Sequence, residues 1–173
     1  GACVLDVGCG PAASVEHLIA QHGLAAVGLD PSVLLLRAGR RRNATLPLIQ
    51  SGGERLPIAS ALFDAVLTEC SLSVMRDTGR ALAEFWRVLR PGGWLILSDV
   101  YARNPDGIEA LRRLPIDSCL CGSVPQADVI ARVEASGFMV RLWEDHTDAL
   151  RVFTARLIWS HGSIQQFWRR ATS

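Results

Sequence analysis

Short apolar runs alternate along the chain with longer segments whose apolar residues recur every three or four positions. The short runs predict β-strands near residues 2–7, 25–29, 47–50, 64–69, 94–99 and 138–144. The longer segments predict helices near residues 12–22, 32–41, 77–89, 125–136 and 147–168, with a further short one near 106–113. This alternation is typical of α/β proteins, so we expect a doubly wound, mostly parallel sheet with helices on both faces.

The segment at residues 77–89 has the clearest predicted ends. Asp77 is suited to cap the first turn of a helix, because its carboxylate can accept hydrogen bonds from the unpaired amides there. The run Arg90-Pro91-Gly92-Gly93 then ends the helix and turns the chain toward the next strand.

Length and composition narrow the class of protein. A chain of 173 residues with 49% hydrophobic and 20% charged residues is typical of one globular domain, which we expect to span residues 1–173. A formal net charge of +1 indicates neither a nucleic-acid nor an anionic-membrane partner, and nothing in the sequence indicates an oligomeric state. Five cysteines, an odd number spread over strands and loops, do not suggest a disulfide framework. Because no apolar run has transmembrane length and no signal peptide precedes the first strand, we expect a cytoplasmic protein.

Both ends of the chain depart from the usual pattern of such a sheet. The first predicted strand starts almost at the first residue, and residues 165–173 show no strand pattern. We therefore expect a fold that lacks the N-terminal helix and the closing strand.

The run Val4-Leu5-Asp6-Val7-Gly8-Cys9-Gly10 carries apolar residues into two glycines, and a helical pattern follows. Asp30 ends the next apolar strand, twenty residues after Gly10. Because glycine has no Cβ, a glycine turn can bring its backbone against a ligand, and the helix behind it offers amides. An acid at the tip of the second strand can accept both hydroxyls of a ribose. The motif predicts a nucleoside-binding site at the carboxyl edge of a parallel sheet.

Two kinds of nucleoside cofactor fit this pattern. The run from Gly8 to Ala13 has the G-x-G-x-x-A spacing of dinucleotide-binding proteins, which makes an NAD(P)-dependent oxidoreductase one hypothesis. Asp6, however, would repel a diphosphate and attract a cation, and Pro11 removes one amide from the turn. Asp6 has a second interpretation, as a carboxylate that only anchors the turn through backbone amides.

The run Asp6-Val7-Gly8-Cys9-Gly10 resembles the first motif of class I S-adenosylmethionine-dependent methyltransferases, whose cofactor carries a sulfonium and an ammonium. Leu56-Pro57 followed by Phe63-Asp64-Ala65-Val66-Leu67 is similar to this family's passage into its fourth strand. The run from Ala83 to Gly93 is similar to its helix-to-fifth-strand segment. The resemblance implies a Rossmann-like fold, S-adenosylmethionine as cofactor and S-adenosylhomocysteine as product. It implies methyl transfer to a small-molecule acceptor, with a non-catalytic cofactor-binding module as an alternative.

The resemblance also implies positions around the cofactor. Those positions are Gly8, Cys9 and Gly10 under the methionine moiety, Asp6 near its ammonium, Asp30 on the ribose hydroxyls, Pro31 and Ser32 beside the adenine, Gly53 and Glu54 at the adenine edge, and Glu69, Cys70 and Ser71 toward the methionine and the acceptor. Two residues depart from the family pattern: Ala12 replaces a common glycine, and Gly52 replaces a common aspartate that accepts from the adenine amino group. The lost hydrogen bond must come from elsewhere, or cofactor affinity falls by about 1–3 kcal/mol.

Methyl transfer from a sulfonium depends mainly on positioning, so a general base is not required and its identity is left open. The candidate bases follow the fifth and sixth predicted strands: Asp99, Tyr101 and His146. The chemistry of a histidine side chain suits the role of a base, although a single histidine is more often a structural hydrogen-bonding residue.

Three cysteines lie where an acceptor would bind. Cys70 ends the fourth predicted strand, while Cys119 and Cys121 lie in the loop after the fifth. The run Ser98-Asp99-Val100-Tyr101-Ala102, followed by Cys119-Leu120-Cys121-Gly122, resembles arsenite methyltransferases, in which one cysteine after each of these strands binds arsenic(III). Cys70 and Cys119 match those two positions, and thiolates suit a thiophilic metalloid.

Other features oppose that alternative. The upstream cysteine of the arsenite enzymes has no match, their C-terminal metal-binding region is absent, and Cys70 also fits a small buried apolar site. Cys119-x-Cys121 lacks two further ligands at zinc-site spacing, so we expect no metal site.

Overall fold

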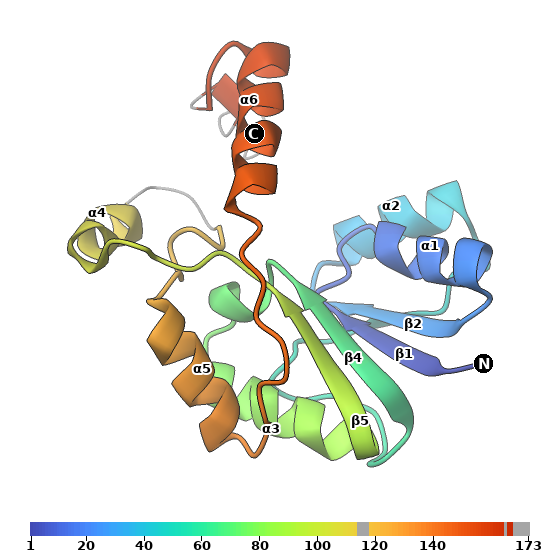
Figure 1. Cartoon of the computed structure of the whole chain (residues 1–173). Helices are drawn as coiled ribbons and strands as arrows, with labels where there is room; N and C mark the ends of the chain where they lie inside the picture. The colour runs from blue at the N-terminus through green and yellow to red at the C-terminus, as the bar shows by residue number, and fades with distance from the viewer. Residues whose placement is uncertain (114–117, 165, 168–173) are drawn as a thin grey trace.

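The computed structural model describes residues 1–113, 118–164, 166 and 167. Its central element is a five-stranded parallel sheet with the strand order β3-β2-β1-β4-β5 (Figure 1). The strands are β1 (Cys3–Val7), β2 (Ala25–Asp30), β3 (Leu48–Gln50), β4 (Phe63–Glu69) and β5 (Leu89–Ser98). This order confirms the predicted doubly wound α/β fold, because the chain winds first to one side of β1 and then to the other.

Strand β1 lies at the centre of the sheet and pairs with both β2 and β4. Asp6 is opposite Gly28 on one side and Leu67 on the other. The crevice where the strand order reverses therefore opens at the end of β1, where ligands of doubly wound sheets bind.

Helices cover both faces of the sheet. They are α1 (Ala13–His22), α2 (Val33–Arg42), α3 (Thr78–Val88), α4 (Ile108–Arg112), α5 (Gln126–Ala135) and α6 (Thr147–His161), with the short 3-10 turns η1 (Leu72–Val74) and η2 (Pro105–Gly107). On one face, Val15 of α1 and Leu36 of α2 pack with Val4. On the other, Phe85 of α3 and Val133 of α5 join the core of Leu5, Val66 and neighbouring side chains. Successive residues of β1 thus serve opposite cores, as the period of a strand requires.

The passage from α3 to β5 follows the predicted signals with one difference. Asp77 caps α3 by accepting a hydrogen bond from the amide of Arg80 at 2.9 Å, as expected. The strand begins directly at Leu89, five residues before the expected start at residue 94. The register shifts between the pairs Phe63–Leu89 and Ala65–Trp94, and Gly92 adopts a positive φ of 81°. The run of Pro and Gly thus forms an irregularity inside the strand instead of a turn before it.

The strand predicted at residues 138–144 is wrong. These residues have the alternation of a strand, and Phe138 and Val140 pack against the core beside α3. No backbone ladder joins this segment to a described strand, however, and Leu142 is 73% exposed. Side-chain alternation alone does not reveal whether a neighbouring strand is available for hydrogen bonding.

The helix predicted at residues 147–168 is shorter in the structure, and its expected last residue lies outside the described part of the chain. Helix α6 ends at His161, where Gly162 follows with a positive φ of 81°. It extends away from the sheet (Figure 1), and none of its described residues is buried. Among the described helices, none combines the length and apolar character that crossing a membrane requires.

Candidate functional site

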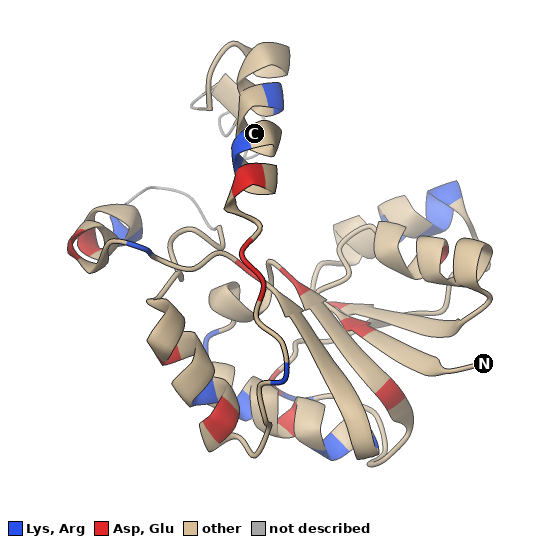
Figure 2. Cartoon of the chain, in the orientation of Figure 1, with Lys and Arg blue, Asp and Glu red and all other residues tan. Residues whose placement is uncertain are grey.

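Three of the predicted site residues, all acidic, come together at the carboxyl edge of the sheet. Because the strands are parallel, their C-terminal ends meet at one edge, and β1, β2 and β4 each carry an acid there: Asp6, Asp30 and Glu69. Figure 2 shows acidic residues at the ends of strands on this edge, with arginines on the helices and loops around the sheet. The edge is thus a place of concentrated negative charge.

The turn after β1 depends on the conformational freedom of Gly8. Its φ is 81°, and a Cβ there would lie 2.3 Å from Oγ of Ser71. Ser71 is buried, and its hydroxyl donates to the carbonyls of Glu69 at 2.8 Å and Val7 at 3.2 Å. Ser71 therefore ties the end of β4 to the end of β1 behind the glycine turn, and its predicted place beside the cofactor stays a prediction.

The amides of this turn are already paired within the protein. The amides of Gly8 and Cys9 donate to the carbonyl of Leu29 at 2.7 and 3.1 Å. The amide of Gly10 donates to Oδ2 of Asp30 at 2.9 Å. Pro11 has no amide hydrogen, so this turn offers a diphosphate little of the donor set that it needs.

Asp30 links the two sides of the crevice. Its second carboxylate oxygen accepts from the amide of Ser32 at 2.8 Å, and Asp30 is 7% exposed. A carboxylate has about four acceptor positions, so each oxygen keeps one for a ligand hydroxyl. Ser32 itself caps α2 by accepting from the amide of Leu35.

The Asp6 carboxylate is buried at 2% exposure, and within the described chain it accepts no hydrogen bond. The structure therefore gives no support to its interpretation as an anchor bonded to turn amides. Burial, then the charges of Glu69 and Asp30, raise the pKa of Asp6 from 3.8 to about 7. A cation bound beside Asp6 would lower this pKa again and favour the ionised carboxylate. A sulfonium or an ammonium group would provide such a positive charge.

Replacing Asp6 with asparagine is expected to have opposite effects on stability and on binding. Ionisation of Asp6 favours the unfolded chain, so its contribution to folding is complete below pH 3.8 and is lost as pH rises to about 7. Asp6→Asn should therefore raise the midpoint of thermal unfolding at pH 8, by roughly 2–4 °C per kcal/mol, with a smaller difference at pH 4.

The same variant should bind S-adenosylmethionine about 10-fold more weakly at pH 7.5, because a hydrogen bond to a charged group contributes about 1.5 kcal/mol or more. Calorimetric titration of both proteins measures this difference. Equal affinities would show that the Asp6 charge has no role in binding.

The remaining cofactor candidates surround the same crevice through backbone and side-chain contacts. Glu69 accepts a hydrogen bond from the hydroxyl of Ser14 at 2.6 Å, and Glu54 accepts from the amide of Arg76 at 3.0 Å. A Cβ on Gly53 would lie 2.8 Å from the side chain of Met75, and the carbonyl of Pro31 accepts from the side chain of Gln50.

The Cys9 thiol is neutral. Burial raises its pKa to about 12, and the charges of Asp6 and Asp30 add to the effect. The roles of Cys9 and of these other candidates toward a cofactor stay predictions.

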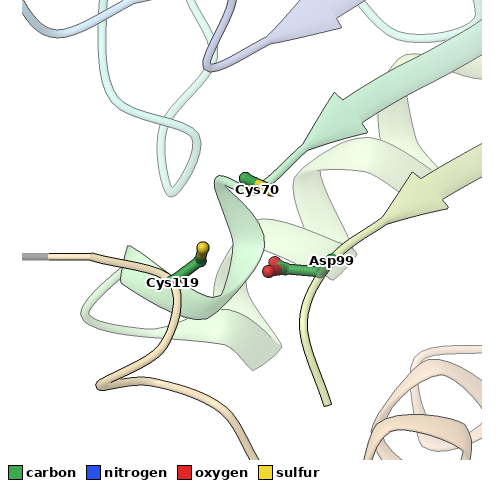
Figure 3. A group of neighbouring side chains, drawn as sticks. All are labelled: Cys70, Asp99 and Cys119. Atoms are coloured by element: carbon green, nitrogen blue, oxygen red, sulfur yellow. The ribbon is translucent and has the colours of Figure 1, made fainter. Parts of the chain in front are cut away.

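Cys70, Asp99 and Cys119 form a second group at this edge, and their side chains face a common space (Figure 3). The sulfur atoms and the nearest carboxylate oxygen lie within 4.8 Å of one another. The interaction between the two thiols lowers the pKa of Cys70 and raises the pKa of Cys119. Cys121 lies outside this group, with its sulfur 3.8 Å from the hydroxyl of Ser118.

The other two candidate bases occupy different surroundings. The hydroxyl of Tyr101 donates to Asp145 at 2.6 Å, and Arg103 contacts both of them. Tyr101 and Arg103 line a cavity of about 500 Å³. His146 is exposed at the start of α6, with Glu144 at 3.3 Å.

Sequence reasoning missed the polar residues that hold these groups in place. Ser73 fixes Asp99 with its amide and hydroxyl, Asp145 pairs with Tyr101, and Ser14 contacts Glu69. No motif marks these residues. The expectation that parallel strands end at one edge indicates only the region of the fold in which such residues lie.

Comparison with known proteins agrees with the geometry. Residues 5–97 match the family model described as a methyltransferase domain. The chain is 38% identical to a demethylmenaquinone methyltransferase from Renibacterium salmoninarum over 176 residues, covering 95% of this chain and 69% of that protein.

Two solved structures share the fold. Phosphoethanolamine N-methyltransferase 2 from Haemonchus contortus, in complex with S-adenosyl-L-methionine, gives a TM-score of 0.74 at 18% identity and covers 90% of this chain and 37% of that one. An arsenic(III) S-adenosylmethionine methyltransferase from Chlamydomonas reinhardtii gives a TM-score of 0.66 at 27% identity and covers 80% of this chain and 52% of that one. The chain thus spans about a third to a half of these two proteins.

The crevice fits the cofactor of this family. Its turn amides are paired within the protein, its acids converge on a buried carboxylate, and Asp30 keeps acceptor positions at the tip of β2. These features suit a cationic nucleoside better than a dinucleotide. With the family match over residues 5–97, they identify the chain as a member of the class I S-adenosylmethionine-dependent methyltransferases.

Proposed function

We propose that this chain is one domain that catalyses methyl transfer from S-adenosylmethionine to a small-molecule acceptor. The observation that carries the proposal is the convergence of Asp6, Asp30 and Glu69 beside a turn whose amides are already paired. Bound S-adenosylmethionine supplies a methyl group activated by its sulfonium. The protein then has to hold the donor and the acceptor in line, which can contribute up to about 7–11 kcal/mol.

In this proposal, different residues of the crevice contact different parts of the cofactor. Asp30 accepts the ribose hydroxyls through its remaining acceptor positions, and Asp6 with Glu69 stabilises the positive charges of the methionine end. Gly8 and Gly10 keep the turn free of side chains where the cofactor approaches. A Cβ on Gly10 would meet no atom within 4 Å, which marks open space at this position.

An acceptor that loses a proton would find candidate bases after β5. Tyr101 lines the 500 Å³ cavity and donates to Asp145, whose pKa is held below its usual range by hydrogen bonds from Thr147, Tyr101 and Arg103. Asp145 therefore stays ionised and orients the Tyr101 hydroxyl. Asp99 lies beside the thiols at the crevice. We propose Tyr101 or Asp99, before His146, as the group that accepts such a proton.

Calorimetric titration with S-adenosylhomocysteine, S-adenosylmethionine and NAD tests the proposal. We expect both sulfur nucleosides to bind and NAD to show no binding. Binding of NAD alone would instead support an oxidoreductase. Cofactor binding without turnover over a broad panel of acceptors would support a non-catalytic module.

A second candidate acceptor is arsenite, and the pairing of Cys70 with Cys119 favours it. These two thiols come from segments far apart in the sequence, and their sulfur atoms lie within 4.8 Å of each other. Thiolates bind soft, thiophilic centres, and the arsenic lone pair attacks the methyl group without a base. We also propose a cytoplasmic location, where thiols are kept reduced. A relative with 27% identity carries arsenic(III) in its name.

Cys70→Ser and Cys119→Ser are each expected to weaken arsenite binding at least about 10-fold, because each removes one thiolate ligand. Quenching of tryptophan fluorescence on addition of arsenite measures the affinity. Cys121→Ser is the matched control and should leave the affinity within about twofold. A parent protein whose fluorescence does not respond to arsenite, with no arsenite bound after gel filtration, would contradict this candidate.

A further inference from the structure

The group formed by Cys70, Asp99 and Cys119 contains two kinds of ligand atom. Cys70 follows β4, Asp99 follows β5, and Cys119 lies in the loop before α5. Two sulfur atoms and a carboxylate oxygen lie within 4.8 Å of one another and face the same space (Figure 3). Arsenite needs only the thiols, so the carboxylate calls for a separate explanation.

We propose that Cys70, Cys119 and Asp99 bind a thiophilic divalent cation such as Zn²⁺, with one coordination position left open. Zn²⁺ takes thiolate sulfur at about 2.3 Å and carboxylate oxygen at about 2.0–2.2 Å, in tetrahedral geometry. Such geometry places neighbouring ligand atoms roughly 3.5–3.8 Å apart. The three side chains therefore need to approach one another by about 1 Å or less.

The carboxylate of Asp99 is oriented by other groups before any ion binds. One oxygen accepts from the amide of Ser73 at 3.0 Å. The other accepts from the hydroxyl of Ser73 and the amide of Val100, each at 2.8 Å. Hydrogen bonds of this kind are what hold carboxylate ligands in metal sites, and the oxygen bonded only to the Ser73 amide retains an acceptor position.

The charges around the two thiols suit a divalent cation. The charges of Asp99 and Glu69 face Cys70, and Asp99 also faces Cys119. These carboxylates attract a divalent cation.

The proposed site differs from the other sites considered. It does not include Cys121, so it is not a zinc site of the Cys-x-Cys type, and it does not depend on methyl transfer. It shares its thiols with the arsenite candidate and adds Asp99. A bound Zn²⁺ would therefore compete with arsenite, whereas loss of the Asp99 carboxylate should weaken only the divalent ion.

Titration of the reduced protein with Co²⁺, followed by displacement with Zn²⁺, tests the proposal without any cofactor. We expect one Co²⁺ per chain with a thiolate charge-transfer band, which Zn²⁺ removes. Cys70→Ser and Cys119→Ser should lose the band, and Asp99→Asn should weaken Co²⁺ binding at least about 10-fold. Cys121→Ser should bind within about twofold of the parent.

Circular dichroism of each variant shows whether it remains folded, and arsenite binding to Asp99→Asn separates the two sites. The proposal is overturned if the parent takes up no Co²⁺ or if folded Asp99→Asn binds Co²⁺ as tightly as the parent. Loss of the band in Cys121→Ser would also overturn it. None of these outcomes depends on whether the protein binds S-adenosylmethionine.

Discussion

Gly8→Ala is expected to lower the free energy of unfolding by about 2–5 kcal/mol and to abolish binding of S-adenosylhomocysteine. A left-handed backbone conformation costs about 1–2 kcal/mol for a residue with a Cβ, and Gly8 has a φ of 81°. The new Cβ would also lie 2.3 Å from Oγ and 2.4 Å from Cβ of Ser71, and overpacking of this kind costs about 1–3 kcal/mol. Urea unfolding and calorimetric titration measure the two effects.

Gly10→Ala provides the matched control for this prediction. Gly10 also has a positive φ, of 54°, but a Cβ there would meet no atom within 4 Å. We expect this variant to lose only about 1–2 kcal/mol of stability and still to bind the cofactor poorly, because the methyl group enters the open crevice. The double variant Gly8→Ala/Ser71→Gly should recover part of the stability lost in Gly8→Ala. Equal destabilisation by the two alanine substitutions would contradict the proposed clash with Ser71.

Asp30→Asn is expected to weaken S-adenosylhomocysteine binding at least about 100-fold and to lower stability by about 1.5–3 kcal/mol. Hydrogen bonds to a charged group contribute about 1.5–3 kcal/mol each, and two ribose hydroxyls would lose such a partner. The stability falls because Asp30 accepts from the amides of both Gly10 and Ser32, whereas the amide nitrogen of asparagine cannot accept. Calorimetric titration and thermal unfolding measure the two changes.

Asp77→Asn is the control for Asp30→Asn. The side chain of Asp77 caps α3 by accepting from the amide of Arg80, and asparagine is about as good an N-cap as aspartate. Its affinity for S-adenosylhomocysteine should equal that of the parent within about twofold. If Asp30→Asn keeps an affinity within threefold of the parent, Asp30 does not hold the ribose.

The fold could be predicted from the sequence because two independent features, the apolar runs and the helical segments between them, locate its strands. Apolar runs locate β1, β2 and β4, and the segments between them have helical periodicity and the length of crossover connections. Residues 138–144 show where this reasoning fails. Their alternation satisfies side-chain packing at Phe138 and Val140, but a strand also needs a ladder, which depends on the rest of the fold.

The sequence was sufficient to predict which strand ends carry the candidate site. Asp30 is the last residue of β2, at the expected spacing from Gly10, and parallel strands bring their ends to one edge. The sequence could not indicate that Ser71 would pack behind Gly8 or that Ser73 would orient Asp99. Those contacts depend on side-chain directions after the strand ends, where the backbone has no periodicity.

The hydrogen bond from the Gly10 amide to Asp30 has a consequence for how a nucleoside enters. It joins the glycine turn to the tip of β2, so both walls of the crevice are held in place by the protein itself. The conformational entropy of these loops is lost during folding, not on association. The site is thus preorganised, and a ligand can be recognised without first reshaping the backbone around it.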